Sequence, residues 1–230
     1  MFVYSFYKFR KILDLQNKRK SLISKLNDLD IKGTILLSKE GINVNISQAE
    51  YLLDDALNII NNIVCLDNVH LNKSPSNHIA FTKLKVKIKN EIIKFNYSGN
   101  QRDNSKLKSI SPQDWDQLLD DDIQVLDMRN SFEYFLGTFN NAISFNLRNF
   151  IDLKDRQSDL GKLDKKKKTA IFCTGGIRCE KAGKYLNDLG FEDVYQLKGG
   201  IINYMNNTRA TSWKGDCFVF DDRIVLKSNL

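Results

Sequence analysis

The stretch that decides the fold of this chain is Cys173-Thr174-Gly175-Gly176-Ile177-Arg178. It follows the apolar run 169–172 and precedes a helical pattern, which is the order strand, turn, helix. Glycines let successive backbone N–H groups curl inward around an anion, and the start of a helix adds partial positive charge. Because both effects favour thiolate over thiol, and Arg178 adds a full positive charge, we predict a reactive cysteine at position 173.

The four cysteines of the chain call for different interpretations. A cysteine at the end of a strand is commonly a small buried hydrophobic residue. The two glycines and the arginine at the fifth position after Cys173 favour a functional thiol there. Cys179 is either a resolving thiol for Cys173 or a side chain packed in the first helical turn, and packing is the commoner role. Cys65 and Cys217 have no such neighbours, so we interpret both as structural.

Strands and helices alternate around this turn. Strands are predicted at 123–127, 142–145, 168–172 and 194–197, with a helix over 180–189. Such alternation indicates a parallel sheet with helices on both faces, in which loops at the carboxyl ends of the strands build the site. Ser111 and Pro112 are typical of a helix start. We therefore predict an α/β domain over 111–208, followed by a C-terminal extension over 209–230.

The first part of the chain has a different order of elements. Strands are predicted at 2–9, 34–37, 42–46 and 69–71, a strand pair within 81–95, and helices over 12–29 and 48–62. The order β-α-β-β-α-β is that of a ferredoxin-like α+β sandwich, whose helices cover one sheet face and leave the other free for a partner. We assign residues 1–97 to this domain and the polar, aperiodic residues 98–110 to a linker.

Positive charge is concentrated in the first part of the chain. Residues 1–100 hold 15 Lys and Arg against 9 Asp and Glu, a net +6, whereas residues 101–230 hold 20 against 19, a net +1. Lysines alternate with apolar residues in one strand, at Lys83, Lys85, Lys87 and Lys89. They are candidates for contacts with a phosphate backbone, and protection of an edge strand from aggregation is an equal alternative.

Composition limits the remaining function classes. No apolar run reaches the roughly 18 residues of a membrane span, and the N-terminus lacks the basic region of a signal peptide, so we expect no membrane association and a cytoplasmic location. With His70 and His78 as the only histidines, we predict no metal site. No dinucleotide-binding glycine pattern is present, so no cofactor is evident from the sequence.

Three separated motifs together resemble a rhodanese domain over roughly residues 110–208. They are the loop 173–178, the segment Asp127-Met128-Arg129-Asn130 with Glu133, and Lys198-Gly199-Gly200-Ile201. The resemblance implies that Cys173 matches the position that carries a persulfide and that Asp127, Arg129 and Glu133 match the structural signature. Cys-based phosphatases have a similar loop but place arginine at the sixth position after the cysteine, where this chain has Cys179.

A narrower resemblance covers nearly the whole chain. The run 173–182, Ser-Phe-Tyr-Lys-Phe at 5–9 and Glu-Gly-Ile-Asn at 40–43 are similar to the bacterial tRNA uridine(34) hydroxylase family, in which a rhodanese domain follows a small N-terminal domain. The resemblance implies oxygen-dependent 5-hydroxylation of the wobble uridine, with tRNA as partner and molecular oxygen as co-substrate. The basic N-terminal part of the chain independently fits a tRNA partner.

Three functions remain open from the sequence. In the first, the Cys173 thiolate or its persulfide adds to C6 of uracil, and Arg178 with the loop N–H groups stabilises the anion. In the second, the chain is a sulfurtransferase that passes sulfur from a thiosulfate-type donor to an acceptor. In the third, it is an inactive tRNA- or partner-binding module. The intact Cys173 disfavours the third, and the added N-terminal domain disfavours the second.

Overall fold

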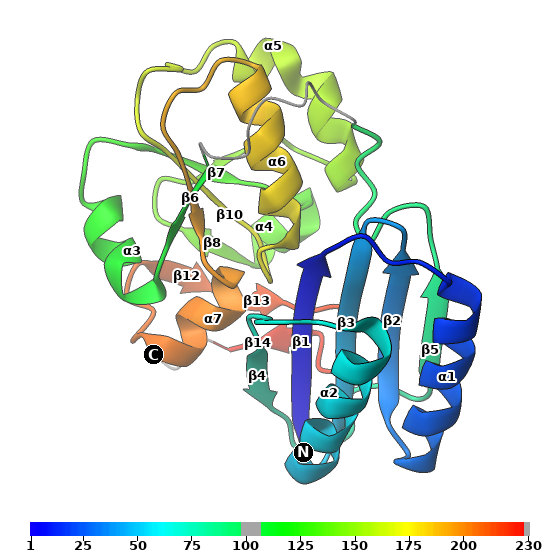
Figure 1. The fold of residues 1–230 in the computed structure, drawn as a ribbon. Helices are drawn as coiled ribbons and strands as arrows, with labels where there is room; N and C mark the ends of the chain where they lie inside the picture. The colour runs from blue at the N-terminus through cyan, green and yellow to red at the C-terminus, as the bar shows by residue number, and fades with distance from the viewer. Residues whose placement is uncertain (98–106, 228–230) are drawn as a thin grey trace. The chain divides into compact units, whose positions relative to one another are not determined.

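The computed structural model describes residues 1–97 and 107–227 (Figure 1). The chain divides into two compact units. The first comprises Met1–Lys94 with Phe220–Arg223, and the second comprises Phe95–Val219 with the residues from Ile224 onward. The two units are described separately below.

The first unit is a five-stranded sheet covered by two helices. Its elements are β1 (Phe2–Phe9), α1 (Leu15–Asp28), β2 (Lys32–Ser38), β3 (Gly41–Gln48), α2 (Glu50–Val64), β4 (Asn72–Pro75) and β5 (Leu84–Ile88). The strand order is β4-β1-β3-β2-β5, with β5 parallel to β2 and the other pairs antiparallel. The predicted order β-α-β-β-α-β is present, and β5 extends it by one edge strand.

Two strand predictions in this unit are wrong. The strand predicted at 69–71 lies instead at Asn72–Pro75, where it pairs with the edge of β1. The strand pair predicted within 81–95 is the single strand β5. Ile92 and Phe95, which follow β5, are buried without forming a strand. The Ile92 N–H donates to a side chain, Glu40 Oε1, at 2.7 Å, where a strand would donate to a neighbouring backbone carbonyl.

The two sheet faces have different surroundings. Tyr4, Phe6, Ile35 and Val44 point toward the helices and belong to the buried core. The opposite face was predicted to be free, and part of it is covered within this unit. The Ala80 N–H donates to Oγ of the buried Ser47 at 3.0 Å, and the Asp222 N–H donates to the Ala80 carbonyl at 2.9 Å.

The lysine-rich strand is at the edge of the sheet. The side chains of Lys83, Lys85, Lys87 and Lys89 are exposed, whereas Val86 between them is buried. The alternation of lysine and apolar residues therefore gives β5 an exposed lysine side and a more buried apolar side, as the sequence indicated. An edge position is compatible with protection of the edge as well as with phosphate binding.

The second unit is a parallel sheet with helices on both faces. Its larger elements are β6 (Leu107–Ile110), α3 (Pro112–Leu119), β7 (Gln124–Asp127), α4 (Ser131–Leu136), β8 (Gly137–Phe139), β9 (Ile143–Ser144), α5 (Gln157–Leu160), β10 (Thr169–Phe172), α6 (Ile177–Asp188), β11 (Val194–Leu197) and α7 (Gly200–Asn207). The strand order is β6-β11-β10-β7-β9, and every pair is parallel. A 3-10 helix at Phe150–Arg156 precedes α5.

Alternating side chains place the helices on opposite sides of this sheet. Ala170 and Phe172 face a core that includes Trp115 of α3 and Tyr204 of α7. Leu107 contacts Gly183 of α6 so closely that a Cβ at Gly183 would meet it at 2.6 Å. Because Leu107 and Ile110 lie three positions apart on one strand, they face opposite sides, and Ile110 packs on the α3–α7 side.

The predicted linker needs a correction where it reaches the second unit. Residues 98–106 lie outside the described residues. Leu107–Ile110 is not a linker, since it forms β6 and pairs in parallel with β11, with Ile110 opposite Leu197. Its polar sequence is tolerated because an edge strand has a partner on one side only.

The predicted C-terminal extension does not stand apart: Ala210, Trp213 and Cys217 lie in the core of the second unit, whereas Phe220–Arg223 belongs to the first. After α7 the chain forms β12 (Trp213–Gly215), β13 (Cys217–Phe218) and β14 (Val225–Leu226). β12 pairs antiparallel with β8, and the buried Trp213 ring lies 5.0 Å from Phe139. Cys217 is buried here, whereas Cys65 is exposed in a left-handed conformation after α2.

Candidate active site

The turn between β10 and α6 holds the predicted reactive cysteine. Cys173 directly follows β10 and is fully buried, and α6 begins at Ile177, so Arg178 lies in the first helical turn. Gly176 has a φ of 95°, a conformation that strongly favours glycine, and its N–H donates to Cys173 Sγ at 3.1 Å. The structure therefore contains the inward-facing backbone N–H group that the sequence predicted at this turn.

The electrostatic environment of Cys173 favours the thiolate. Burial alone would raise the pKa of this thiol. The hydrogen bond from the Cys179 side chain, the charge of Arg178 and backbone N–H groups of Arg178 and Cys179 outweigh burial and lower the pKa of Cys173 to about 6. Near neutral pH the sulfur is consequently anionic, which is the form that acts as a nucleophile.

Cys179 has the opposite properties. It is fully buried in the first turn of α6, and burial together with the neighbouring Cys173 raises the pKa of its thiol well above the ordinary value. Cys179 stays protonated and donates to the Cys173 sulfur. The packed location agrees with the commoner of its two predicted roles, and the contact with Cys173 keeps the resolving role open.

Arg178 is held by a carboxylate from a different part of the chain. Nη1 and Nη2 of Arg178 lie 2.6 and 2.7 Å from the two oxygens of Glu133, and Thr174 Oγ1 donates to the same carboxylate at 3.0 Å. Burial would raise the pKa of Glu133, but the Arg178 charge and hydrogen bonds lower it. Glu133 also accepts from the Asn130 N–H, which closes a capping box at the start of α4.

This position of Glu133 adds a role that the sequence analysis did not assign. The sequence placed Glu133 with the structural signature, but its side chain directly contacts two residues of the cysteine loop. The sequence signal that could have indicated this role is the spacing of Glu133 from Asp127. This spacing places the Glu133 carboxylate at the third position of α4, soon after β7 ends. Glu133 is therefore a positioning residue for Thr174 and Arg178.

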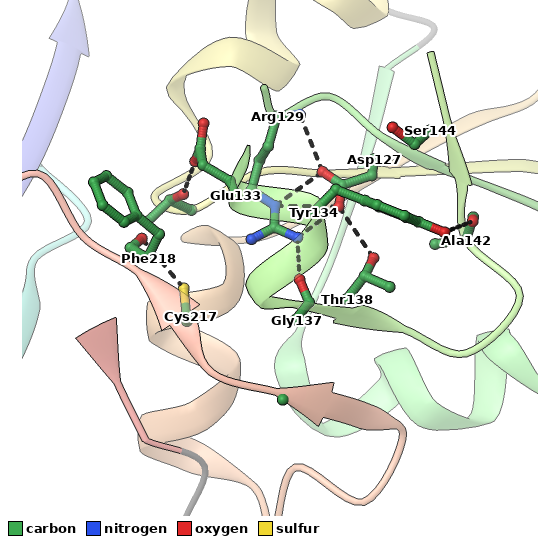
Figure 2. A network of polar contacts seen from close by, with 12 residues as sticks. Asp127, Arg129, Glu133, Tyr134, Gly137, Thr138, Ala142, Ser144, Cys217 and Phe218 are labelled. Carbon is green, nitrogen blue, oxygen red and sulfur yellow. Dashed lines mark hydrogen bonds and ion pairs between the residues drawn. The ribbon is translucent and has the colours of Figure 1, made fainter. Parts of the chain in front are cut away.

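Asp127 and Arg129 form a second buried ion pair. Arg129 Nη2 lies 2.6 Å from Asp127 Oδ2 and 2.6 Å from the Gly137 carbonyl, and Thr138 Oγ1 donates to Asp127 at 3.0 Å (Figure 2). The guanidinium also lies 5.1 Å from the centre of the Trp213 ring. This pair fastens β7 to the segment after α4, and its charges act on Glu133 and Arg178 of the other buried pair.

The start of α7 supports the cysteine loop by hydrogen bonds to the carbonyl groups of the loop. The N–H groups of Ile201 and Ile202 donate to the carbonyls of Cys173 and Thr174 at 3.0 and 3.1 Å. A Cβ at Gly200, whose φ is 69°, would meet the Cys173 carbonyl oxygen at 2.4 Å. The Lys-Gly-Gly-Ile motif at 198–201 thus serves as a support for the loop, which needs glycine at position 200.

Gly175 marks the open side of the loop. A Cβ built there meets no atom within 4 Å, although its neighbours Thr174 and Gly176 are buried. The loop is therefore open at Gly175, whereas Cys173 itself is buried. The lysines of β5 belong to the first unit.

Comparisons with known proteins agree with both halves of the chain. Residues 1–92 match the family described as UPF0176 acylphosphatase-like domain, and residues 111–207 match the rhodanese-like domain. A tRNA uridine(34) hydroxylase from Pelagibacter ubique is 41% identical over 99% of this chain and 76% of its own length. The chain belongs to the tRNA uridine(34) hydroxylase family. A member from Legionella pneumophila is 38% identical over 98% of this chain and 90% of its own.

Membership in the tRNA uridine(34) hydroxylase family confirms the predicted fold class. The α/β prediction, with a ferredoxin-like first domain and a rhodanese-like second domain built on a parallel sheet, agrees with the two matched families and with the observed sheets. A solved rhodanese-related protein from Thermoplasma volcanium is 27% identical, with a TM-score of 0.36, and covers 43% of this chain and 91% of its own.

Two other kinds of feature are absent from the described residues. Among residues 1–97 and 107–227, no group of three or more His, Cys, Asp or Glu side chains is arranged to hold a metal ion. Within the same ranges, none of the helices combines the length and apolar character needed to cross a membrane.

Proposed function

We propose that this protein hydroxylates C5 of uridine 34 in tRNA, with Cys173 as the reacting nucleophile. The observation that carries the proposal is the geometry around Cys173: its sulfur accepts from the Gly176 N–H in a loop that Glu133 fixes through Arg178. These surroundings lower the pKa of Cys173 to about 6 and favour the thiolate. Membership in a family whose named members are tRNA uridine(34) hydroxylases supports the substrate, and the net charge of +7 fits a polyanionic partner. A tRNA substrate also supports the expected cytoplasmic location.

The chemistry begins with addition of sulfur to the base. The thiolate forms a bond to C6 of uracil, and the C5–C6 π electrons move toward C5 and O4 as an enolate. Backbone N–H groups of the loop and Arg178 stabilise the anion before and after this step. The enolate carbon then attacks molecular oxygen and, after proton uptake, carries a hydroperoxide at C5.

Completion of the reaction needs two electrons and two protons. We assign them to a pair of thiols, which become a disulfide while the hydroperoxide O–O bond is cleaved to a C5 hydroxyl and water. Loss of the C5 proton then expels the Cys173 thiolate and restores the C5–C6 double bond. The sum is uridine, oxygen and two thiols giving 5-hydroxyuridine, water and a disulfide, so Cys173 is regenerated unchanged.

The loop favours this chemistry over phosphoryl transfer. Arg178 is at the fifth position after Cys173, and both of its terminal nitrogens are bound by Glu133, so its charge is partly offset within the protein. A loop with this charge balance suits a single anionic sulfur or enolate better than a doubly charged phosphate. The same preference also fits a persulfide on Cys173, which makes sulfur transfer the second candidate.

Nucleoside analysis of tRNA tests the proposal. Cells that lack the gene are complemented with the wild-type chain, with Cys173→Ala, or with Cys65→Ala as a control at an exposed cysteine. We expect 5-hydroxyuridine and its derivatives with the wild type and the control, and their loss with Cys173→Ala. Retained 5-hydroxyuridine in Cys173→Ala would refute the role of the thiolate. An unchanged nucleoside profile in the deletion, together with strong thiosulfate–cyanide activity of the purified protein, would establish sulfur transfer instead.

A further inference from the structure

One face of helix α4 exposes large apolar side chains beside the cysteine loop. Phe132 is 45% exposed, Phe135 is 77% exposed and Leu136 is 43% exposed. Residues three and four positions apart lie on one side of a helix, so these three side chains share a face. Soluble proteins rarely gather large apolar residues at the surface without a binding role.

The same helix carries Glu133, which contacts the active-site loop. Glu133 is fully buried and binds Thr174 and Arg178, while its neighbour Phe132 packs edge-to-face on Phe218 with ring centres 4.9 Å apart. α4 thus presents one edge to the cysteine loop and the adjacent face to the surface. A ligand bound to the exposed face therefore contacts the same helix that carries Glu133.

The helix is held rigidly on its remaining sides. The N–H and Oγ of Ser131 both donate to the Leu147 carbonyl, at 2.8 and 2.9 Å, and the Leu136 carbonyl accepts from the Asp216 N–H at 2.8 Å. Gly137 is enclosed so tightly that a Cβ there would meet the Asp216 carbonyl oxygen at 2.5 Å. A fixed helix presents its aromatic rings in one orientation, as a stacking surface requires.

Positive residues flank this helix at both ends. Arg148 follows the Leu147 carbonyl that Ser131 binds, and Lys214 pairs with Thr138 immediately after α4; both cations are exposed. Aromatic rings between cations are the combination that binds single-stranded nucleic acid, because the rings stack on bases while the cations contact phosphates.

We propose that the exposed face of α4, formed by Phe132, Phe135 and Leu136, is a stacking platform for unpaired bases of the tRNA anticodon loop. The inference rests on the proposed function, and it assigns to that function the surface that receives the bases adjacent to the reacting uridine. Single-stranded loops are the parts of RNA whose bases can unstack and pack on aromatic side chains.

Binding measurements with defined RNA test the platform. The probe is an anticodon stem-loop with uridine at the wobble position, titrated into the full chain. Phe135→Ala is expected to weaken binding about 5- to 150-fold, the range for loss of one aromatic–base stack. The matched control is Tyr51→Ala, which removes an aromatic ring that is 70% exposed on α2, and it is expected to leave affinity within twofold.

A second variant reports stacking directly. Trp115 and Trp213 are both buried, so Phe135→Trp places an exposed tryptophan at the platform. We expect its fluorescence to be quenched by the stem-loop and not by a duplex of the same length, whereas Tyr51→Trp should show no difference. The salt dependence of RNA binding should be unchanged in Phe135→Ala and reduced in Lys214→Gln, because Lys214 contacts phosphate and Phe135 does not.

The outcomes separate the platform from the function on which it rests. Wild-type affinity and unquenched fluorescence in the Phe135 variants, in a protein that still hydroxylates tRNA, would overturn the platform alone. Wild-type chain that binds the stem-loop through Phe135 but forms no 5-hydroxyuridine would overturn the proposed reaction and keep the platform. A Phe135→Ala variant that alters self-association in sedimentation without changing RNA affinity would show that a second copy of the chain occupies the face.

Discussion

Replacing Glu133 by glutamine should lower the free energy of unfolding and also lower the pKa of Cys173. The substitution keeps the size of the side chain and removes the charge that pairs with the buried Arg178. Leaving one partner of a buried ion pair without its counter-charge destabilises a protein by about 3–5 kcal/mol. The guanidinium charge is then no longer offset, so the pKa of Cys173 should fall further below about 6, by on the order of one unit.

Both effects can be measured in the full chain. The chain has two tryptophans, Trp115 and Trp213, and both lie in the second unit, so their fluorescence during urea titration follows unfolding of that unit. The pKa of Cys173 is read from the pH dependence of its alkylation rate, followed on the peptide that contains it. Glu192→Gln applies the same chemical change to an exposed residue and should alter the free energy of unfolding by less than about 0.5 kcal/mol.

Two results would refute this reasoning. One is a free energy of unfolding for Glu133→Gln within the range of the Glu192→Gln control, which would mean that the ion pair contributes nothing to the fold. The other is a rise in the pKa of Cys173 in Glu133→Gln, which would mean that the carboxylate, and not the guanidinium, stabilises the thiolate.

Three further predictions concern the same unit. Burial of Cys173 is outweighed, and its folded pKa lies near 6, below the ordinary value of 9.0. Its thiolate therefore stabilises the fold fully above about pH 9, and up to about 4 kcal/mol of this stabilisation is lost as the pH falls through 6. Cys173→Ala should remove this pH dependence of the free energy of unfolding from urea titrations. Gly200→Ala should abolish activity and lower the midpoint of thermal unfolding, because the added Cβ meets the Cys173 carbonyl. Gly175→Ala should leave the midpoint unchanged, because a Cβ there meets no atom. Equal midpoints of the two variants would contradict the supporting role of α7. Asp127→Asn should destabilise the unit by about 3–5 kcal/mol in urea titrations, because it leaves the buried Arg129 without its counter-charge, and a free energy of unfolding equal to that of the wild type would contradict this role.

The cysteine loop could be predicted from sequence because local chemistry determines it. A glycine pair after an apolar strand permits the turn, and the left-handed Gly176 forms it. The partner of Arg178 could not be predicted in the same way. Glu133 reaches the loop through the pairing of β7 with β10, and a contact between residues so far apart in sequence depends on the register of the sheet.

The errors in the strand predictions have a related cause. Asn72–Pro75 forms a strand because the edge of β1 offers backbone partners, although the more apolar segment just before it has the stronger strand pattern. Leu107–Ile110 likewise becomes a strand through pairing with β11. In both cases the neighbour supplies the hydrogen bonds, so the tertiary context overrides local propensity.

The pairing of β12 with β8 has a consequence for how the chain is synthesised. Trp213 completes the aromatic core around Phe139, and the Asp216 N–H binds the end of the helix that carries Glu133. The first unit also receives a late contact, from the Asp222 N–H to the Ala80 carbonyl. A ribosome delivers both Asp216 and Asp222 after the cysteine loop, so these hydrogen bonds cannot form when only the loop has emerged. The nascent protein therefore completes the support of the helix that carries Glu133 only after Asp216 has emerged.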